Sequence, residues 1–295
     1  MSGTSSTADQ PRDSNRRHRV FRNPLVVRLT HWLSALALLI LTMSGMQIFN
    51  AHAALYASDA SDFAHPALAI GGGMDSRGDP KGFVQFGSRR ISTTHVLGWG
   101  PNGYGEEGPR AFPAWATMPP QQDLANGRRW HIAFAWIFVL CGLTFAPWAL
   151  RLWPSRADMR ALPHALRTHL LPWKVAPSAQ QNPLQKLTYF GLVFIVVPIA
   201  ILSGLALAPA VDSWAHWLPA IFGGRQFARI WHFAAMITII VFFVGHVVMV
   251  ALTGLVNNMR SMITGWLVVP QSAAAGGVVR PSAADEPAAK VPALS

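Results

Sequence analysis

The sequence contains very little cysteine and little charge. The one cysteine, Cys141, excludes an intrachain disulfide and lies in an apolar stretch, where we interpret it as a small core residue. Charged residues make up 13% of the chain, whereas 51% of its residues are hydrophobic. Soluble domains typically have about 25% charged residues. This balance disfavours a soluble globular protein and predicts a membrane protein.

Four long segments have no charged residue except Lys186, which lies near the start of the third. They cover residues 29–49, 130–150, 184–208 and 230–256. Each is close to the ~20 residues that a helix needs to cross a bilayer. None alternates between polar and apolar residues as a membrane β-barrel would. The predicted fold is therefore an all-α membrane protein, a four-helix transmembrane bundle.

Acidic residues are also scarce, 13 against 24 basic ones, but the basic residues do not form the single patch expected of a nucleic-acid-binding protein. Fifteen of them, counting Lys186 at the start of the third span, lie with only five acids before the first span, between the second and third, or after the fourth. Cytoplasmic loops are enriched in Lys and Arg. We therefore expect a multi-pass protein of the bacterial inner membrane with both termini cytoplasmic. A cleaved signal peptide, suggested by Arg16-Arg17 and Ala51-His52-Ala53, is disfavoured because the first apolar run is too long.

The regions outside the spans differ in composition. Residues 1–22 and 267–295 are predicted to be disordered cytoplasmic tails around a domain of residues 23–266. Residues 50–126 are rich in Gly and Pro without a long periodic element, and predict a long irregular extracytoplasmic loop, here called the cap. Its aromatic residues favour a docking surface. The alternative is a cover that merely shields the bundle.

Each span except the third contains histidine, and titratable residues inside a membrane are often functional. The four are His31, His131, His232 and His246. Any one of them alone could simply bond a nearby hydroxyl or carbonyl. However, His232 and His246 are 14 residues apart, which places them on one helix face about 21 Å apart. With alternating helix directions, His131 falls level with His232 towards the outer side, and His31 with His246 towards the cytoplasm.

Two facing imidazoles at each level are what a six-coordinate haem b needs, so the pattern predicts two haem b groups. Zinc would need further ligands, and the spans offer none nearby. Arg28, Arg128 and Arg229 each precede a histidine by three residues and either pair with haem propionates or simply snorkel at helix ends. The pairs Ser44-Gly45 and Ser203-Gly204 provide small residues where a porphyrin or a helix comes close. The third span, without histidine, is expected only to complete the bundle.

These residues resemble the di-haem cytochrome b subunits of nickel-hydrogenases, formate dehydrogenases and thiosulfate reductases, over roughly residues 20–266. The resemblance implies the same pairing: the first and last histidines on a cytoplasmic haem, the middle two on a periplasmic one. It also implies a quinone site at Asn182 and Gln185, in the stretch Asn182-Pro183-Leu184-Gln185-Lys186. Alternatively, Asn182 only caps a helix that begins at Pro183.

Within this family, three features are more similar to the subunits that pair with periplasmic molybdopterin oxidoreductases than to the hydrogenase subunits. They are the long cap, the stretch Phe112-Pro113-Ala114-Trp115 and residues 258–265. The resemblance thus implies an electron-transfer subunit between such a partner and quinone, rather than a complete enzyme. Two other functions stay open: a transporter with an intramembrane histidine proton relay, and a structural membrane anchor. Histidines at two levels rather than one midplane site favour haem over a transporter.

Overall fold

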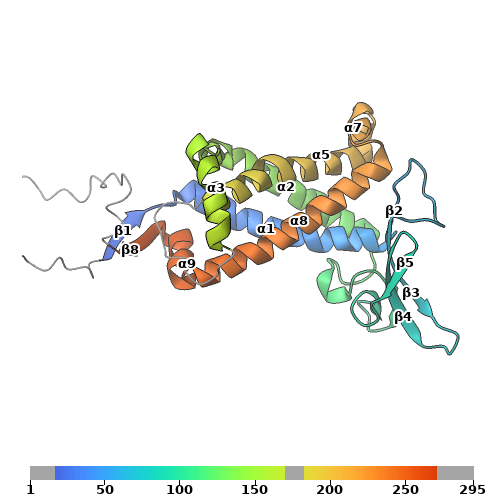
Figure 1. The fold of residues 1–295 in the computed structure, drawn as a ribbon. Helices are drawn as coiled ribbons and strands as arrows, with labels where there is room; N and C mark the ends of the chain where they lie inside the picture. The colour runs from blue at the N-terminus through green and yellow to red at the C-terminus, as the bar shows by residue number, and fades with distance from the viewer. Residues whose placement is uncertain (1–16, 170–182, 271–295) are drawn as a thin grey trace, which may run out of the picture. The chain divides into compact units, whose positions relative to one another are not determined.

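The computed structural model describes residues 17–169 and 183–270 (Figure 1). These residues divide into two compact units. The larger unit contains Leu29–Pro154 and Lys186–Gly245. The described part of the smaller unit contains residues 17–28, 155–169, 183–185 and 246–270. Three of the four long helical segments have residues in both units. The units are considered separately below.

Among the described residues, four helical segments are long and apolar enough to cross a membrane, as the sequence predicted. They are α1 (Leu25–Asn50), α2 (Leu124–Ala149) with the short 3₁₀ helix η2 (Leu150–Leu152), the segment Pro183–Leu207, and α8 (Arg225–Leu252). Helices α1, α2 and α8 begin earlier than the predicted apolar runs, because basic residues end an apolar run without ending a helix. The start of α2 is fixed by Asp123, whose side chain accepts a hydrogen bond from the Asn126 backbone N–H (3.0 Å).

The third span is not a uniform α-helix. It consists of α4 (Pro183–Gly191), the π-helical segment η3 (Leu192–Val196) and α5 (Val197–Leu207). Pro198 has no backbone N–H to donate, and the wider π turn ends two residues before it, at Val196. Pro209 follows α5 and opens α6 (Pro209–Asp212), after which come α7 (Trp217–Ile221) and α8.

Small side chains lie inside the spans and large ones outside. Among the residues at 0–1% exposure are Ala37, Ser44, Ser203, Ala206 and Ala228. Many large apolar side chains on the same helices are exposed, including Leu39, Leu143 and Val241. In a soluble protein the distribution is the opposite, with large apolar side chains buried in the core. The observed distribution suits a bundle in lipid, where small residues let helices approach and large apolar ones face hydrocarbon.

The cap contains regular β-structure, so the expectation of an all-α protein with an irregular loop was wrong here. Strands β2, β3, β4 and β5, labelled in Figure 1, form an antiparallel sheet in that order, and β6 pairs with β7. Their bounds are Ala54–Leu55, Leu68–Met74, Pro80–Phe86, Arg89–Ser92, Gly98–Pro101 and Glu107–Arg110. A short 3₁₀ helix, η1 (Ala114–Ala116), follows. The glycines that suggested an irregular loop allow close backbone contacts: a Cβ on Gly82 would lie 2.2 Å from the Leu97 carbonyl oxygen.

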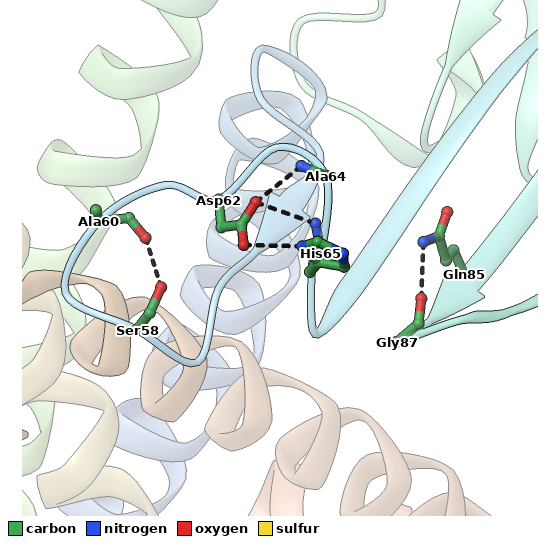
Figure 2. A network of polar contacts seen from close by, with 7 residues as sticks. All are labelled: Ser58, Ala60, Asp62, Ala64, His65, Gln85 and Gly87. Atoms are coloured by element: carbon green, nitrogen blue, oxygen red, sulfur yellow. Dashed lines mark hydrogen bonds and ion pairs between the residues drawn. The ribbon is translucent and has the colours of Figure 1, made fainter.

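The loop between β2 and β3 is held by its own side chains, as Figure 2 shows. Asp62 accepts hydrogen bonds from the backbone N–H groups of Ala64 (3.0 Å) and His65 (3.3 Å) and contacts His65 Nδ1 at 3.0 Å. Ser58 donates to the Ala60 carbonyl at 2.6 Å. His65 therefore has a local structural role.

The cap packs on the C-terminal end of α1. The side-chain oxygen of Asn50 accepts from the Phe112 backbone N–H at 2.8 Å. The ring of Phe49 contacts both Phe112, in the cap, and Phe233, on α8, with centroids 5.8 and 4.9 Å apart. Arg110 is 5% exposed and donates to the carbonyl of Phe112 and to Thr117 Oγ1. These contacts hold the cap close to Phe233, the residue that follows His232.

In the smaller unit, residues near the two ends of the described chain pair with each other. Strand β1 (Arg17–Phe21) is antiparallel to β8 (Trp266–Pro270). The prediction of disordered tails is therefore wrong for residues 17–22 and 267–270, since the backbone N–H of Arg22 also donates to the Gly265 carbonyl, and its remainder lies outside the described residues. The unit also contains α3 (Arg156–His169) and α9 (Leu255–Thr264). The side chain of Asn257 on α9 bonds both backbone groups of Val268 on β8, at 2.8 and 3.1 Å.

Candidate functional site

Two of the four predicted histidines face each other inside the larger unit. His131 lies two turns into α2 and His232 two turns into α8, and their ring centroids are 6.0 Å apart. The ring planes make an angle of 68°. The structure thus brings together the pair that the sequence predicted for the outer level.

Both imidazoles are held through the same nitrogen. His131 Nδ1 lies 3.1 Å from Ser44 Oγ and 3.1 Å from the Leu41 carbonyl oxygen, both on α1. His232 Nδ1 lies 3.1 Å from Ser203 Oγ and 3.0 Å from the Ala200 carbonyl oxygen, both on α5. A carbonyl can only accept, so each Nδ1 carries the hydrogen. Each Nε2 then has a free lone pair for a metal.

Glycines let the rings lie against the helices that hold them. A Cβ on Gly45, next to Ser44, would meet the His131 ring at 3.4 Å. A Cβ on Gly204, next to Ser203, would meet the His232 ring at 3.0 Å. The sequence predicted close approach at these glycines, and the group that approaches is an imidazole ring.

This donor set fits a haem iron. A metal–imidazole bond is about 2 Å long. Two such bonds, with the ring radius at either end, account for the separation of the two ring centroids. Within the described residues, no group of three or more His, Cys, Asp or Glu side chains is placed to hold a metal ion. Two neutral nitrogens therefore suit an iron whose remaining ligands come from a porphyrin.

The predicted inner pair is not assembled within one unit. His31 lies on α1 in the larger unit, with its ring edge-on to Trp32 at 5.1 Å between centroids, and His246 lies on α8 in the smaller unit. Both side chains are half-buried. Their pairing stays a prediction.

The three arginines that precede histidines have different surroundings. Arg28 donates to the Ile263 carbonyl, and its buried Nε has no hydrogen-bond partner in the described structure. Arg128 is exposed. Arg229 donates to the carbonyls of His52 (3.2 Å) and Ala54 (2.9 Å). Arg229 is therefore engaged with the cap, and a propionate role for any of the three stays a prediction.

Of the two predicted quinone residues, Gln185 is half-buried on α4, and Asn182 lies outside the described residues. The described part of helix α4 starts at Pro183, and the capping alternative for Asn182 also lies outside the described residues. The quinone role of Asn182 and Gln185 stays a prediction.

Sequence reasoning missed the hydrogen bonds of Ser44 and Ser203. The third span does more than complete the bundle, because α5 holds His232 as α1 holds His131. The available signal was the Ser-Gly pair that occurs in both spans. The small residues of this pair indicate close packing, and each pair also supplies a hydroxyl.

Residues 22–265 match the model of the prokaryotic cytochrome b561 family, so the chain belongs to this family of membrane-integral b-type cytochromes. Membership implies a b haem. The chain is also 27% identical, over 252 residues, to a protein of Azospira oryzae named "Putative protein-methionine-sulfoxide reductase subunit YedZ1". That similarity covers 82% of this chain and 96% of the relative. No solved structure matches the chain.

Proposed function

We propose that this chain is the membrane subunit of an oxidoreductase complex and carries electrons between a periplasmic partner and the quinone pool through two b haems. The observation that carries the proposal is the facing pair His131 and His232, each held at Nδ1 with its Nε2 available. A purely structural anchor or a proton relay does not explain why two imidazoles inside the spans lie 6.0 Å apart with both Nε2 lone pairs unused by these contacts.

Haem bound at this pair would supply one-electron chemistry at its iron. The chain contributes ligands, orientation and exclusion of water. His131 and His232 would bind the iron through their Nε2 atoms. Ser44, Ser203 and the backbone carbonyls orient the rings, and Phe49 packs on Phe112 and on Phe233, the residue after His232.

At the cytoplasmic level, His31 and His246 hold a second haem in this proposal. The unsatisfied Nε of Arg28, three residues before His31, supports an anionic group such as a propionate nearby. Quinone would be reduced or oxidised beside this haem, with Asn182 and Gln185 positioning its carbonyls. A carbonyl that gains charge on reduction needs such a hydrogen-bond donor.

The cap is the proposed docking surface for the partner. It contains ordered sheets with exposed aromatic side chains, among them Phe63, Tyr104 and Trp115. The relative's printed name makes it a subunit of a reductase. A partner that reduces its substrate would draw electrons from quinol, through the inner haem and then the outer one. Its identity as a molybdopterin enzyme rests on the resemblance of the cap and its neighbouring motifs.

The experiment is a dithionite-reduced minus oxidised absorption spectrum of the purified chain, followed by reduction with a soluble quinol analogue. We expect b-type bands from two haems per chain and quinol-dependent reduction of both. Replacing Asn182 with Asp preserves a helix cap but removes the amide donor, and should slow reduction by quinol while both haems stay bound. A folded, colourless protein would contradict the whole proposal, and full dithionite reduction without any quinol reduction would contradict the quinone step.

A further inference from the structure

The supports of His131 and His232 are two copies of one arrangement. Each uses a Ser-Gly pair on a neighbouring span, and in each the histidine Nδ1 contacts the serine Oγ and the carbonyl three residues before that serine. The two sets of distances agree to within 0.1 Å: 3.1 and 3.1 Å for His131, and 3.1 and 3.0 Å for His232. Helices α1 and α5 are therefore equivalent in their relation to the site.

The direction of each hydrogen bond follows from the serine's other contacts. Ser44 Oγ lies 2.6 Å from the Ile40 carbonyl oxygen, and Ser203 Oγ lies 2.6 Å from that of Ile199. A carbonyl only accepts, so the hydroxyl hydrogen points to it. The oxygen then accepts from histidine Nδ1–H. Each site is a chain from Nδ1–H to hydroxyl to backbone carbonyl.

Other hydroxyls in the spans show that this contact with histidine is not a general consequence of helix geometry. Thr144 and Thr238 also donate to the carbonyl four residues earlier, both at 2.8 Å. Their residues are exposed, whereas Ser44 and Ser203 are completely buried. These threonines lie on the histidine-bearing helices α2 and α8 and are suitable matched controls.

We infer that Ser44 and Ser203 are paired positioning residues that fix the angle between the two imidazole planes and tune the redox potential of the outer haem. The inference rests on the proposed function. A ring held by two acceptors at Nδ1 cannot rotate freely about its bond to the metal. Hydrogen bonding at Nδ1 also makes Nε2 a stronger donor, which favours the oxidised iron. Loss of either hydroxyl should therefore favour the reduced state.

The test compares Ser44→Ala, Ser203→Ala and the double variant with Thr144→Ala and Thr238→Ala as controls. The first readout is the electron paramagnetic resonance spectrum of the oxidised outer haem, which is sensitive to the angle between the ligand planes. The second is a redox titration. Each serine variant should shift the spectrum and raise the reduced-to-oxidised ratio at a fixed potential about fivefold, the effect of one neutral hydrogen bond. In the double variant the change in the reduced-to-oxidised ratio should be about the product of the two single changes. The two control variants should show neither a spectral shift nor a change in this ratio.

The outcomes separate this inference from the proposed function. A parent protein without haem would overturn both. A parent with haem, whose spectrum and potential are unchanged in both serine variants, would overturn this inference alone. If Ser44→Ala or Ser203→Ala loses the outer haem, Ser44→Thr or Ser203→Thr is tested at the same position. This substitution keeps the hydroxyl, so the variant must retain the haem. Equal loss of the outer haem from the Ser→Ala and Ser→Thr variants at one position would indicate a packing role for that serine and overturn the assignment.

Discussion

Arg229 lies where the candidate haem site meets the cap. It precedes His232 by three residues, and its guanidinium donates to the carbonyls of His52 and Ala54 at the start of the cap. Hydrogen bonds from a charged group contribute about 1.5–3 kcal/mol when they are partly buried. Arg229 therefore ties the cap to the helix that carries a proposed haem ligand.

Replacing Arg229 with Gln should loosen the cap, whereas replacing Arg128 with Gln should not. Arg128 has the same position relative to its histidine but is exposed. We expect faster proteolysis of residues 50–126 in the Arg229 variant alone. Equal proteolysis rates for both variants and the parent would show that Arg229 does not hold the cap.

His52 gives the same region a dependence on pH. The pKa of His52 is lowered, first because the ring loses solvent and second because Arg229 is positively charged. The neutral ring is also within hydrogen-bond distance of Tyr56, with 3.1 Å from Nε2 to the hydroxyl oxygen. Since the folded pKa lies below the unfolded value, the stability from His52 is complete above that value and is lost as pH falls through the folded pKa.

The cap should therefore become more sensitive to protease as pH falls below about 6.5, the ordinary histidine pKa. Glutamine at position 52 keeps an acceptor for Tyr56 but cannot titrate. In the His52→Gln variant, the rate at which protease cleaves the cap should therefore not change between pH 7.5 and 5.5. Limited proteolysis at several pH values measures this. The same pH profile in the parent and in the glutamine variant would contradict the assignment to His52.

Among the secondary-structure elements, the cap depends on glycines that bring strands and loops close together. A Cβ on Gly82 in β4 would lie 2.2 Å from the Leu97 carbonyl oxygen and 3.1 Å from the Trp99 backbone nitrogen. A Cβ on Gly73 in β3 would meet nothing within 4 Å. Backbone atoms cannot move aside as a flexible side chain can, so the two glycines should differ strongly in their tolerance of alanine.

Gly82→Ala should disrupt the cap, at a cost of about 1–3 kcal/mol or more, and abolish association with the partner. Gly73→Ala should leave association intact. Co-purification of whatever binds the intact cap, with haem content as the control for the bundle, tests this. If the Gly82 variant loses its cap structure but binds the partner normally, the cap is not the docking surface.

The spans were predictable because hydrocarbon tolerates few charges, so that the absence of Asp, Glu, Lys and Arg marks them. The residues at which the helices start could not be predicted in this way, because a residue such as Arg28 ends an apolar run but continues the helix. The sheets of the cap were missed because glycine in β3 and β4 removes the alternation that predicts a strand. The pair His131 and His232 followed from spacing and helix direction. The hydrogen bonds of Ser44 and Ser203 depend on side-chain contacts between helices, which spacing does not reveal.

For the whole molecule, the proposed function places two haems at different depths between an outer docking surface and an inner quinone site. The four spans lie within the match to a membrane cytochrome family, and the facing imidazoles of α2 and α8 support the proposal of a haem at one of the two levels. The inner level, the sidedness of the termini and the quinone site are proposals. All of them depend on the histidines acting as two separate pairs of ligands.

Haem content in single histidine variants tests that claim most directly. The parent should contain two b haems per chain. His131→Ala and His232→Ala should each lose the same outer haem and keep the inner one, and His31→Ala and His246→Ala should do the opposite. His216→Ala, which changes an exposed histidine, is the control and should keep both. Full haem content in His131→Ala or His232→Ala, or a different haem lost from each of these two variants, would contradict the account.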